Sequence, residues 1–182
     1  MSAVKKYLTA INTMMSPNKF RNKEWYYNGI YDFILREGKQ YKSQKLTEDE
    51  KEKVMGLIDS FTYLFGEPKS KQCYYNSQMA AMTDSNFQYV EGYALASMGL
   101  PLAHAFLVIN DKVVDLTWKH KDTNELIAGE HSLEYWGVPI HIEDIKKACF
   151  DTSMSQSHLE GWWNKCVLYR KKFKHGEPYY AK

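Results

Sequence analysis

The chain has 182 residues, of which 44% are hydrophobic and 25% are charged, as is typical of one globular domain. A formal net charge of +2 is too small to indicate a nucleic-acid or membrane partner. No apolar run approaches the roughly 20 residues that span a bilayer, and the N-terminus lacks the apolar region and cleavage site of a signal peptide. We therefore expect a cytoplasmic protein without a membrane partner.

The three cysteines are Cys73, Cys149 and Cys166. Their odd number, their wide spacing and the lack of a CxxC motif argue against a disulfide framework and indicate a reducing compartment. Cys149, His158 and Cys166 could be imagined as metal ligands, but their spacing fits no zinc pattern. We expect neither a metal nor an organic cofactor.

The first third of the chain has the pattern of helices. Apolar residues recur at helical spacing from Val4 to Met15, and a second helix is expected from Asn22 to Arg36. The third helix has the clearest signals, because Thr47 and Glu50 form a capping box ahead of a broad apolar stripe. Gly66 and Pro68 end this helix.

The middle of the chain changes from helical to strand patterns. After a loop over residues 66–71, a short helix is expected from about Cys73 to Met82. Strands are expected over residues 87–96, 102–109 and 112–118. Asn110 and Asp111 form a two-residue hairpin turn between the last two strands.

The last third has weaker signals. A short strand is expected from Tyr135 to Ile140, a short helix from Ile142 to Cys149, and a further helix after the capping box of Ser157 and Glu160. The basic stretch RKKFKH near the end is interpreted as a solvated tail, so no nucleic-acid partner is expected.

These elements predict an α+β fold in which N-terminal helices precede a helix packed on a small antiparallel sheet. No repeat or long linker divides the chain. We expect one domain over residues 1–182, comprising a helical part (1–66), a core (67–140) and a C-terminal helical part with a tail (141–182).

The hairpin register provides a geometric test for one polar pair. With Asn110 and Asp111 as the turn, Phe106 lies opposite Asp115 and His104 lies opposite Thr117. Because side chains alternate along a strand, His104 and Asp115 then share one face as diagonal neighbours. Diagonal neighbours are about 7–8 Å apart, a distance that long side chains bridge.

Cys73 supplies the third group of a candidate catalytic constellation. At a helix start, the thiol experiences the positive end of the helix dipole, which favours its reactive thiolate form. The backbone N–H groups there can hold the oxyanion of an attacked carbonyl. We expect Cys73 to act as nucleophile, His104 as base and Asp115 as the group that orients His104.

Structural interpretations of the same residues stand beside this hypothesis. A lone cysteine is often a small buried hydrophobe and a lone histidine a satisfied core group, whereas a carboxylate in a half-buried strand requires a partner. Tyr74 and Trp118 flank the candidate site, where each could line a substrate groove or pack in the core.

The ordered motifs from Gln72 to Trp118 resemble the transglutaminase-like (papain-like) cysteine superfamily. The matching pieces, in chain order, are Gln72-Cys73-Tyr74, Tyr89-Val90-Glu91-Gly92-Tyr93, His104-Ala105-Phe106 and Val114-Asp115-Leu116-Thr117-Trp118. The resemblance implies the same assignment of nucleophile, base and orienting carboxylate. Helices before the cysteine and a YWGVP segment after the triad make the chain similar to compact phage or bacterial members, which would place a phage-encoded protein in the host cytoplasm.

The resemblance implies chemistry on an amide or other acyl bond. The superfamily includes proteases, amidases, deamidases and acyltransferases, so it does not choose between hydrolysis and transfer. The expected substrate is a protein, a peptide or a small amide-containing molecule. The alternative is a non-catalytic binding protein on the same fold, which could be a phage accessory protein that holds a protein, a small ligand or a nucleic acid.

Overall fold

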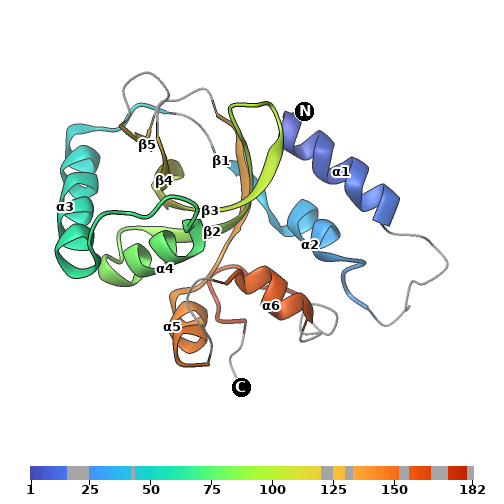
Figure 1. Cartoon of the computed structure of the whole chain (residues 1–182). Helices are drawn as coiled ribbons and strands as arrows, with labels where there is room; N and C mark the ends of the chain where they lie inside the picture. The colour runs from blue at the N-terminus through green and yellow to red at the C-terminus, as the bar shows by residue number, and fades with distance from the viewer. Residues whose placement is uncertain are drawn as a thin grey trace.

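The computed structural model describes residues 1–15, 25–41, 44–119, 125–129, 133–151, 156–164 and 172–179. The expected α+β class is confirmed: N-terminal helices accompany a six-stranded antiparallel sheet that curls into a half-barrel and packs against helices (Figure 1). Within the described ranges, no helix is both long enough and apolar enough to cross a membrane.

Three helices precede most of the sheet: α1 (Ala3–Met15), α2 (Ile30–Glu37) and α3 (Glu48–Phe65). The predicted capping box of α3 is present, since Glu50 N donates to Thr47 Oγ1 and Thr47 N donates to the Glu50 carboxylate. The prediction for α2 was wrong at its start. Residues 26–29 form bends and the helix begins only at Ile30, while residues 22–24 of the predicted helix lie outside the described chain.

The sheet contains β1 (Lys39–Tyr41), β2 (Gln88–Leu95), β3 (Pro101–Ile109), β4 (Lys112–Lys119), β5 (Leu126–Ala128) and β6 (Tyr135–Pro139). Its spatial order is β1-β6-β2-β3-β4-β5, and all described pairings are antiparallel. The sheet is therefore larger than expected, because the three-residue strands β1 and β5 are too short to produce a periodic sequence signal.

Alternation along the strands separates two apolar clusters. Tyr89, Leu107 and Val114 belong to the larger cluster, which also includes buried side chains of α1, α2, α3, α4 and α6. Val90 and Phe106, on the opposite face, belong to a smaller cluster. This smaller cluster is defined by Tyr41, Val90, Ala94, Phe106, Val108, Val113 and Tyr135.

Helix α4 (Cys73–Thr83) joins the sheet where two strands separate. The ladder between β3 and β4 follows the predicted register at Ile109–Lys112, Val108–Val113 and Leu107–Val114, and ends there in the described chain. The predicted pairs Phe106–Asp115 and His104–Thr117 are thus not formed. Instead, Ser77 Oγ of α4 donates to Ala105 O, 3.2 Å away, and Asn76 Nδ2 donates to Thr117 Oγ1, 3.0 Å away.

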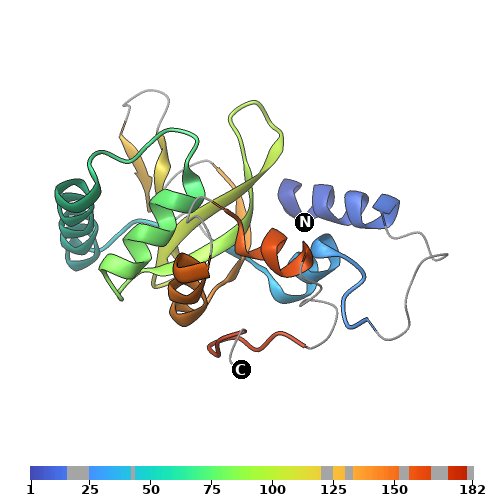
Figure 2. The same ribbon diagram turned by 60° about the horizontal axis from the view of Figure 1, so that its bottom comes forward.

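The C-terminal part packs against helices that come earlier in the chain. Helix α5 (Ile142–Asp151) packs beside α4, and α6 (His158–Asn164) packs on α2 (Figures 1 and 2). The tail was expected to be solvated, but Phe173 and Tyr179 are buried. Tyr179 N also donates to Asp144 Oδ2 at 2.7 Å. The described part of the tail, residues 172–179, is therefore packed on the fold.

Candidate functional site

The β3–β4 hairpin positions the candidate base and carboxylate. Asn110 and Asp111 adopt left-handed backbone conformations, with φ of 50° and 65°, which a tight two-residue hairpin turn requires at both positions. Further along the strands, His104 Nε2 and Asp115 Oδ2 are 2.7 Å apart. The expected contact is present even though the ladder has already ended between them.

Asp115 is fully buried and all its described contacts stabilise a carboxylate. Its Oδ2 accepts from His104 and from the Tyr135 hydroxyl at 2.8 Å. Its Oδ1 accepts from the backbone N–H groups of Thr117 and Trp118, at 2.8 and 3.1 Å. The latter two bonds hold the irregular segment between Asp115 and Lys119, where the β4–β5 register shifts.

His104 and Asp115 shift each other's pKa values in the folded protein. Burial alone would lower the pKa of His104, but the charge and hydrogen bond of Asp115 and the neighbouring Cys73 thiol raise it to about 9. Burial would raise the pKa of Asp115, yet the His104 charge and hydrogen bond, with the two backbone donors, hold it below its usual value. The raised pKa of His104 and the lowered pKa of Asp115 both favour an imidazolium–carboxylate pair at neutral pH.

Cys73 is the first residue of α4 and is half-buried. Its thiol lies close enough to His104 to raise the pKa of the imidazole. Because Nε2 of His104 is bonded to Asp115, Nδ1 is the ring nitrogen left for the thiol. Gln72, at the N-cap, makes no side-chain capping bond to the helix, so the first N–H groups of α4 receive no cap from it. Cys73, His104 and Asp115 are thus brought together at one place in the fold.

The two flanking aromatic residues have different positions. The Trp118 ring stacks on His104, with ring centroids 4.2 Å apart and planes inclined by 24°. Tyr74 instead packs against the larger apolar cluster. Burial, followed by the charge of Glu91, raises the pKa of Tyr74 above its usual value. Trp118 is therefore the flanking aromatic residue that covers the imidazole.

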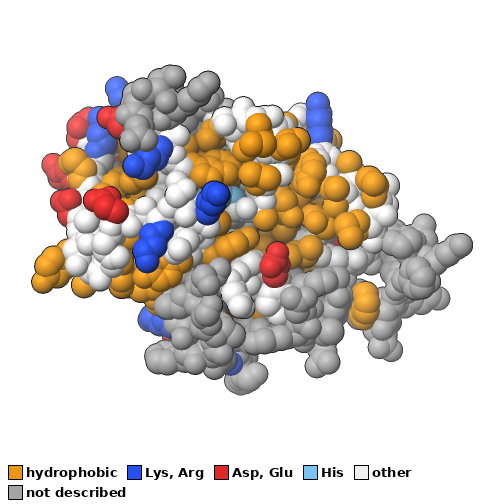
Figure 3. All heavy atoms as spheres, viewed as in Figure 1, with side chains coloured by type: hydrophobic (Ala, Val, Ile, Leu, Met, Phe, Trp, Pro, Cys, Tyr) orange, Lys and Arg blue, Asp and Glu red, His pale blue; other side chains and the backbone are white. Residues whose placement is uncertain are grey.

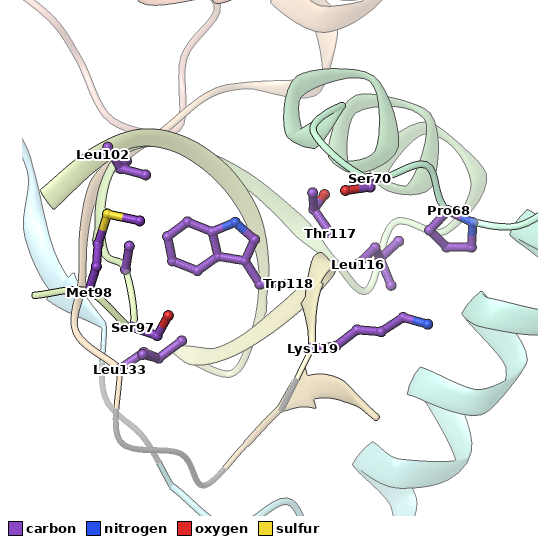
Figure 4. Close-up of a pocket in the computed structure, with 11 residues that line it drawn as sticks. Pro68, Ser70, Ser97, Met98, Leu102, Leu116, Thr117, Trp118, Lys119 and Leu133 are labelled. Carbon is purple, nitrogen blue, oxygen red and sulfur yellow. The ribbon is translucent and has the colours of Figure 1, made fainter. Parts of the chain in front are cut away.

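Trp118 also lines an open cavity of about 570 Å³. In Figure 4, its indole stands between Met98, Leu102 and Leu133 on one side and Ser70 and the base of Lys119 on the other. Ser70 lies three residues before Cys73 in the loop that leads into α4. The cavity therefore adjoins the candidate site through both Trp118 and this loop.

Two features of this region were not identified from the sequence. Tyr135 lies on β6, which is not a neighbour of β4 in the sheet, so only the curl brings its hydroxyl to Asp115. The stacking of Trp118 on His104 depends on the irregular backbone after Asp115. The motif pattern contained both residues but no signal for either contact.

A second buried polar cluster surrounds Glu91. Its carboxylate accepts from Tyr89 Oη at 2.7 Å, Ser157 Oγ at 2.6 Å, and His158 N and Nδ1 at 2.7 and 3.0 Å. Burial would raise the pKa of Glu91, but the hydrogen bond and charge of His158 and the other donors lower it. This cluster joins the central strand to the start of α6 and was not predicted.

The remaining candidates do not form a site in the described chain. No group of three or more potential metal ligands occurs among the described residues. His158 is occupied by Glu91, whereas the Cys149 side chain and Cys166 lie outside the described residues. The same holds for His120 and His131, and His141 Nδ1 accepts from Glu143 N at 3.2 Å.

Comparison with protein-family models, with curated proteins and with solved structures finds no match to this chain.

Proposed function

We propose that this protein is a cysteine-dependent hydrolase or acyltransferase that acts on an amide or related acyl bond. The observation that carries this proposal is the hydrogen bond of 2.7 Å between His104 and the buried Asp115 carboxylate, with the Cys73 thiol near enough to raise the pKa of His104. A thiol at a helix start, a base in contact with it and a buried acid that orients the base are the parts that nucleophilic acyl chemistry requires.

In the proposed reaction, the Cys73 thiolate attacks the carbonyl carbon and forms a tetrahedral oxyanion. The backbone N–H groups at the start of α4 would hold this oxyanion. Collapse of the intermediate breaks the carbon–nitrogen bond and leaves a thioester, while the His104 imidazolium gives its proton to the departing amine. Water or an acceptor amine then attacks the thioester, and His104 takes the proton released.

The resemblance to the transglutaminase-like (papain-like) cysteine superfamily supports the same roles. Cys73 at the start of α4, His104 on β3 and Asp115 on β4 follow the order that the resemblance implies. We infer a compact member in which a curled antiparallel sheet carries the base and carboxylate. Its substrate would be a protein, a peptide or a small amide-containing molecule.

The alternative proposal is a binding protein on the same fold. One observation favours it: His104 is only 2% exposed and Trp118 covers its ring. A substrate would therefore have to reach the thiol, which is half-buried, rather than the imidazole. The reactivity of Cys73 distinguishes the two proposals.

The test is the alkylation rate of each cysteine by iodoacetamide, followed by mass spectrometry of the peptides. For an active site, we expect Cys73 to react faster than Cys149 and Cys166 near neutral pH. His104→Ala should slow the Cys73 reaction about tenfold or more, because it removes the charge that stabilises the thiolate.

His175→Ala is the matched control, since it removes an exposed imidazole that pairs with Glu37 at 3.6 Å. We expect it to leave the Cys73 rate unchanged. Equal rates at all three cysteines, or equal effects of the two histidine substitutions, would contradict the enzymatic proposal and favour the binding protein.

A further inference from the structure

The cavity beside Trp118 combines an apolar wall with a cationic end. Met98, Leu102 and Leu133 form the wall around the indole (Figure 4). The Lys119 side chain extends on the other side of Trp118, toward the loop before α4. A site with these two parts fits a ligand that is apolar at one point and negatively charged at another.

The apolar wall is exposed yet has a defined backbone. Met98 is 71% exposed and Leu102 is 44% exposed. The hairpin between β2 and β3 that carries them is held by hydrogen bonds from Ala96 N to Leu100 O, 2.9 Å, and from Gly99 N to Ala96 O, 2.8 Å. Figure 3 shows hydrophobic side chains gathered over this hairpin. An exposed apolar surface of this kind, on a preformed hairpin, is typical of a binding site.

Lys119 gives the cavity a preference for a negatively charged ligand group. It is exposed, and none of the ion pairs among the described residues involves it. It is also the single charged residue among the described side chains that line the cavity. A carboxylate placed here would meet an unneutralised ammonium group, whereas a second cation would be repelled.

The cavity adjoins the candidate site through Trp118 and the loop before α4. Trp118 forms part of the lining and stacks on His104, while Ser70 leads directly into the helix that begins with Cys73. A chain lying in the cavity would therefore lie beside the ring that covers His104 and beside the loop that leads to Cys73. Such positioning near a nucleophile is worth more to catalysis than tight binding elsewhere.

We propose that this cavity binds a peptide segment in which a large apolar side chain stands beside an acidic residue. The apolar side chain packs between Trp118 and the wall of Met98, Leu102 and Leu133, and the carboxylate pairs with Lys119. As a specificity site, this inference rests on the proposed function. As a binding site, it does not require Cys73 to be reactive.

The experiment uses the full-length Cys73→Ala protein, so that binding is measured without turnover. Four dye-labelled hexapeptides differ at two adjacent positions, with Leu or Ser at one and Glu or Lys at the next. Fluorescence anisotropy gives each affinity. We expect the Leu-Glu peptide to bind most tightly, with a loss of about tenfold or more for Ser in place of Leu.

Two charge-reversal variants in the same Cys73→Ala background test the role of Lys119. Lys119→Glu should reverse the preference so that the Leu-Lys peptide binds more tightly than Leu-Glu. Lys6→Glu makes the same change in net charge on α1, at an exposed residue outside the cavity lining, and should preserve the original preference. Met98→Ser should reduce the advantage of Leu over Ser in either charge context.

Four equal affinities, no binding up to ~1 mM peptide, or the same effect of Lys119→Glu and Lys6→Glu would overturn the cavity proposal. A reactive Cys73 combined with any of these results would still leave the enzymatic proposal standing. Selective binding combined with an unreactive Cys73 would support the cavity and contradict the enzymatic proposal, so the two failures are separable.

Discussion

At the scale of single residues, the site depends on one buried carboxylate that serves several donors. Asp115 bonds simultaneously to His104, Tyr135 and two backbone N–H groups of its own strand. It therefore fixes the orientation of the imidazole and the backbone that places Trp118 over it. A change at Asp115 acts on the charge of His104 and on this local geometry together.

Asp115→Asn keeps the size of the side chain but removes the charge. Because that charge raises the pKa of His104 to about 9, the variant should have a less basic imidazole. If the proposed enzyme is correct, we expect activity to fall by roughly 10⁴-fold, as when the orienting carboxylate of a triad is replaced by its amide. The measurement is the pH dependence of Cys73 alkylation, which should move to higher pH in the variant because a neutral His104 no longer stabilises the thiolate.

The same pair predicts how stability depends on pH. The pKa of His104 is raised in the folded protein from 6.5 to about 9, so its contribution is complete below pH 6.5 and is lost as the pH rises through about 9. Urea unfolding of the wild type should show this loss, and Asp115→Asn should show a smaller one. Identical slopes for the two proteins in this range would contradict the assigned ion pair.

At the scale of elements, two paired glycines allow β2 and β6 to approach. Gly92 lies opposite Gly137, and a Cβ atom at Gly92 would collide with the backbone of Trp136 and Gly137. No flexible side chain is available to move aside, because the obstructing atoms are backbone. Gly92 also lies opposite His104 of the neighbouring strand β3. The close approach of β2 and β6 therefore supports the strand that carries the candidate base.

Gly92→Ala should lower the free energy of unfolding by about 2–3 kcal/mol, the cost of overpacking a filled region. Gly56→Ala is the matched control, since Gly56 lies within α3 and a Cβ there meets nothing within 4 Å. It should raise stability by about 0.5–1 kcal/mol through helix propensity. Chemical denaturation of both variants checks the pair, and equal effects would refute the packing argument.

Local signals explain which elements could be predicted from the sequence. Helix α3 combines a capping box with a long apolar stripe, and the Asn110-Asp111 turn fixes the first three pairs of the hairpin. Beyond those pairs, the strands separate and side chains of α4 bond to both of them. Sequence periodicity contains no information on such a separation, although the predicted face of His104 and Asp115 was sufficient for their contact.

Contacts that depend on the curl of the sheet could not be predicted. Tyr135 reaches Asp115 from a strand that is distant in the sheet order, and Glu91 meets Ser157 from 66 positions away in the chain. Neither pair shares a local motif. The predicted start of α2 was too early for a different reason: residues 26–29 have an apolar pattern that resembles a helix but form bends.

At the scale of the whole molecule, Glu91 connects the central strand to the C-terminal part. Its carboxylate accepts the Ser157 hydroxyl and the backbone N–H groups of His158 and Leu159. In this way it supplies acceptors for the first turn of α6, which itself packs on α2. One buried side chain therefore joins two distant segments of the chain, β2 and the start of α6.

Glu91→Gln should detach α6 more readily, because an amide cannot serve as acceptor for all these donors. We expect a loss of ~3 kcal/mol, as is usual when one partner of a buried charged network is replaced. Since the pKa of Glu91 is lowered in the folded protein, the wild type should lose this contribution as the pH falls below the usual range of a glutamate.

Hydrogen exchange of the α6 amides, measured across acidic pH, checks this prediction. The wild type should become less protected on acidification, whereas Glu91→Gln should be poorly protected at every pH. Asp49→Asn is the control, because that residue pairs with Lys53 on the exposed side of α3. Similar exchange in both variants would contradict the role assigned to Glu91.

The stacking of Trp118 on His104, with ring centroids 4.2 Å apart, gives the protein an internal optical signal. A protonated imidazole in contact with an indole quenches its fluorescence, and a neutral imidazole does so less. The difference in emission between wild type and Trp118→Phe should therefore increase as the pH rises through about 9. The proton on the candidate base could then be followed by light, without a substrate, while ligands are tested.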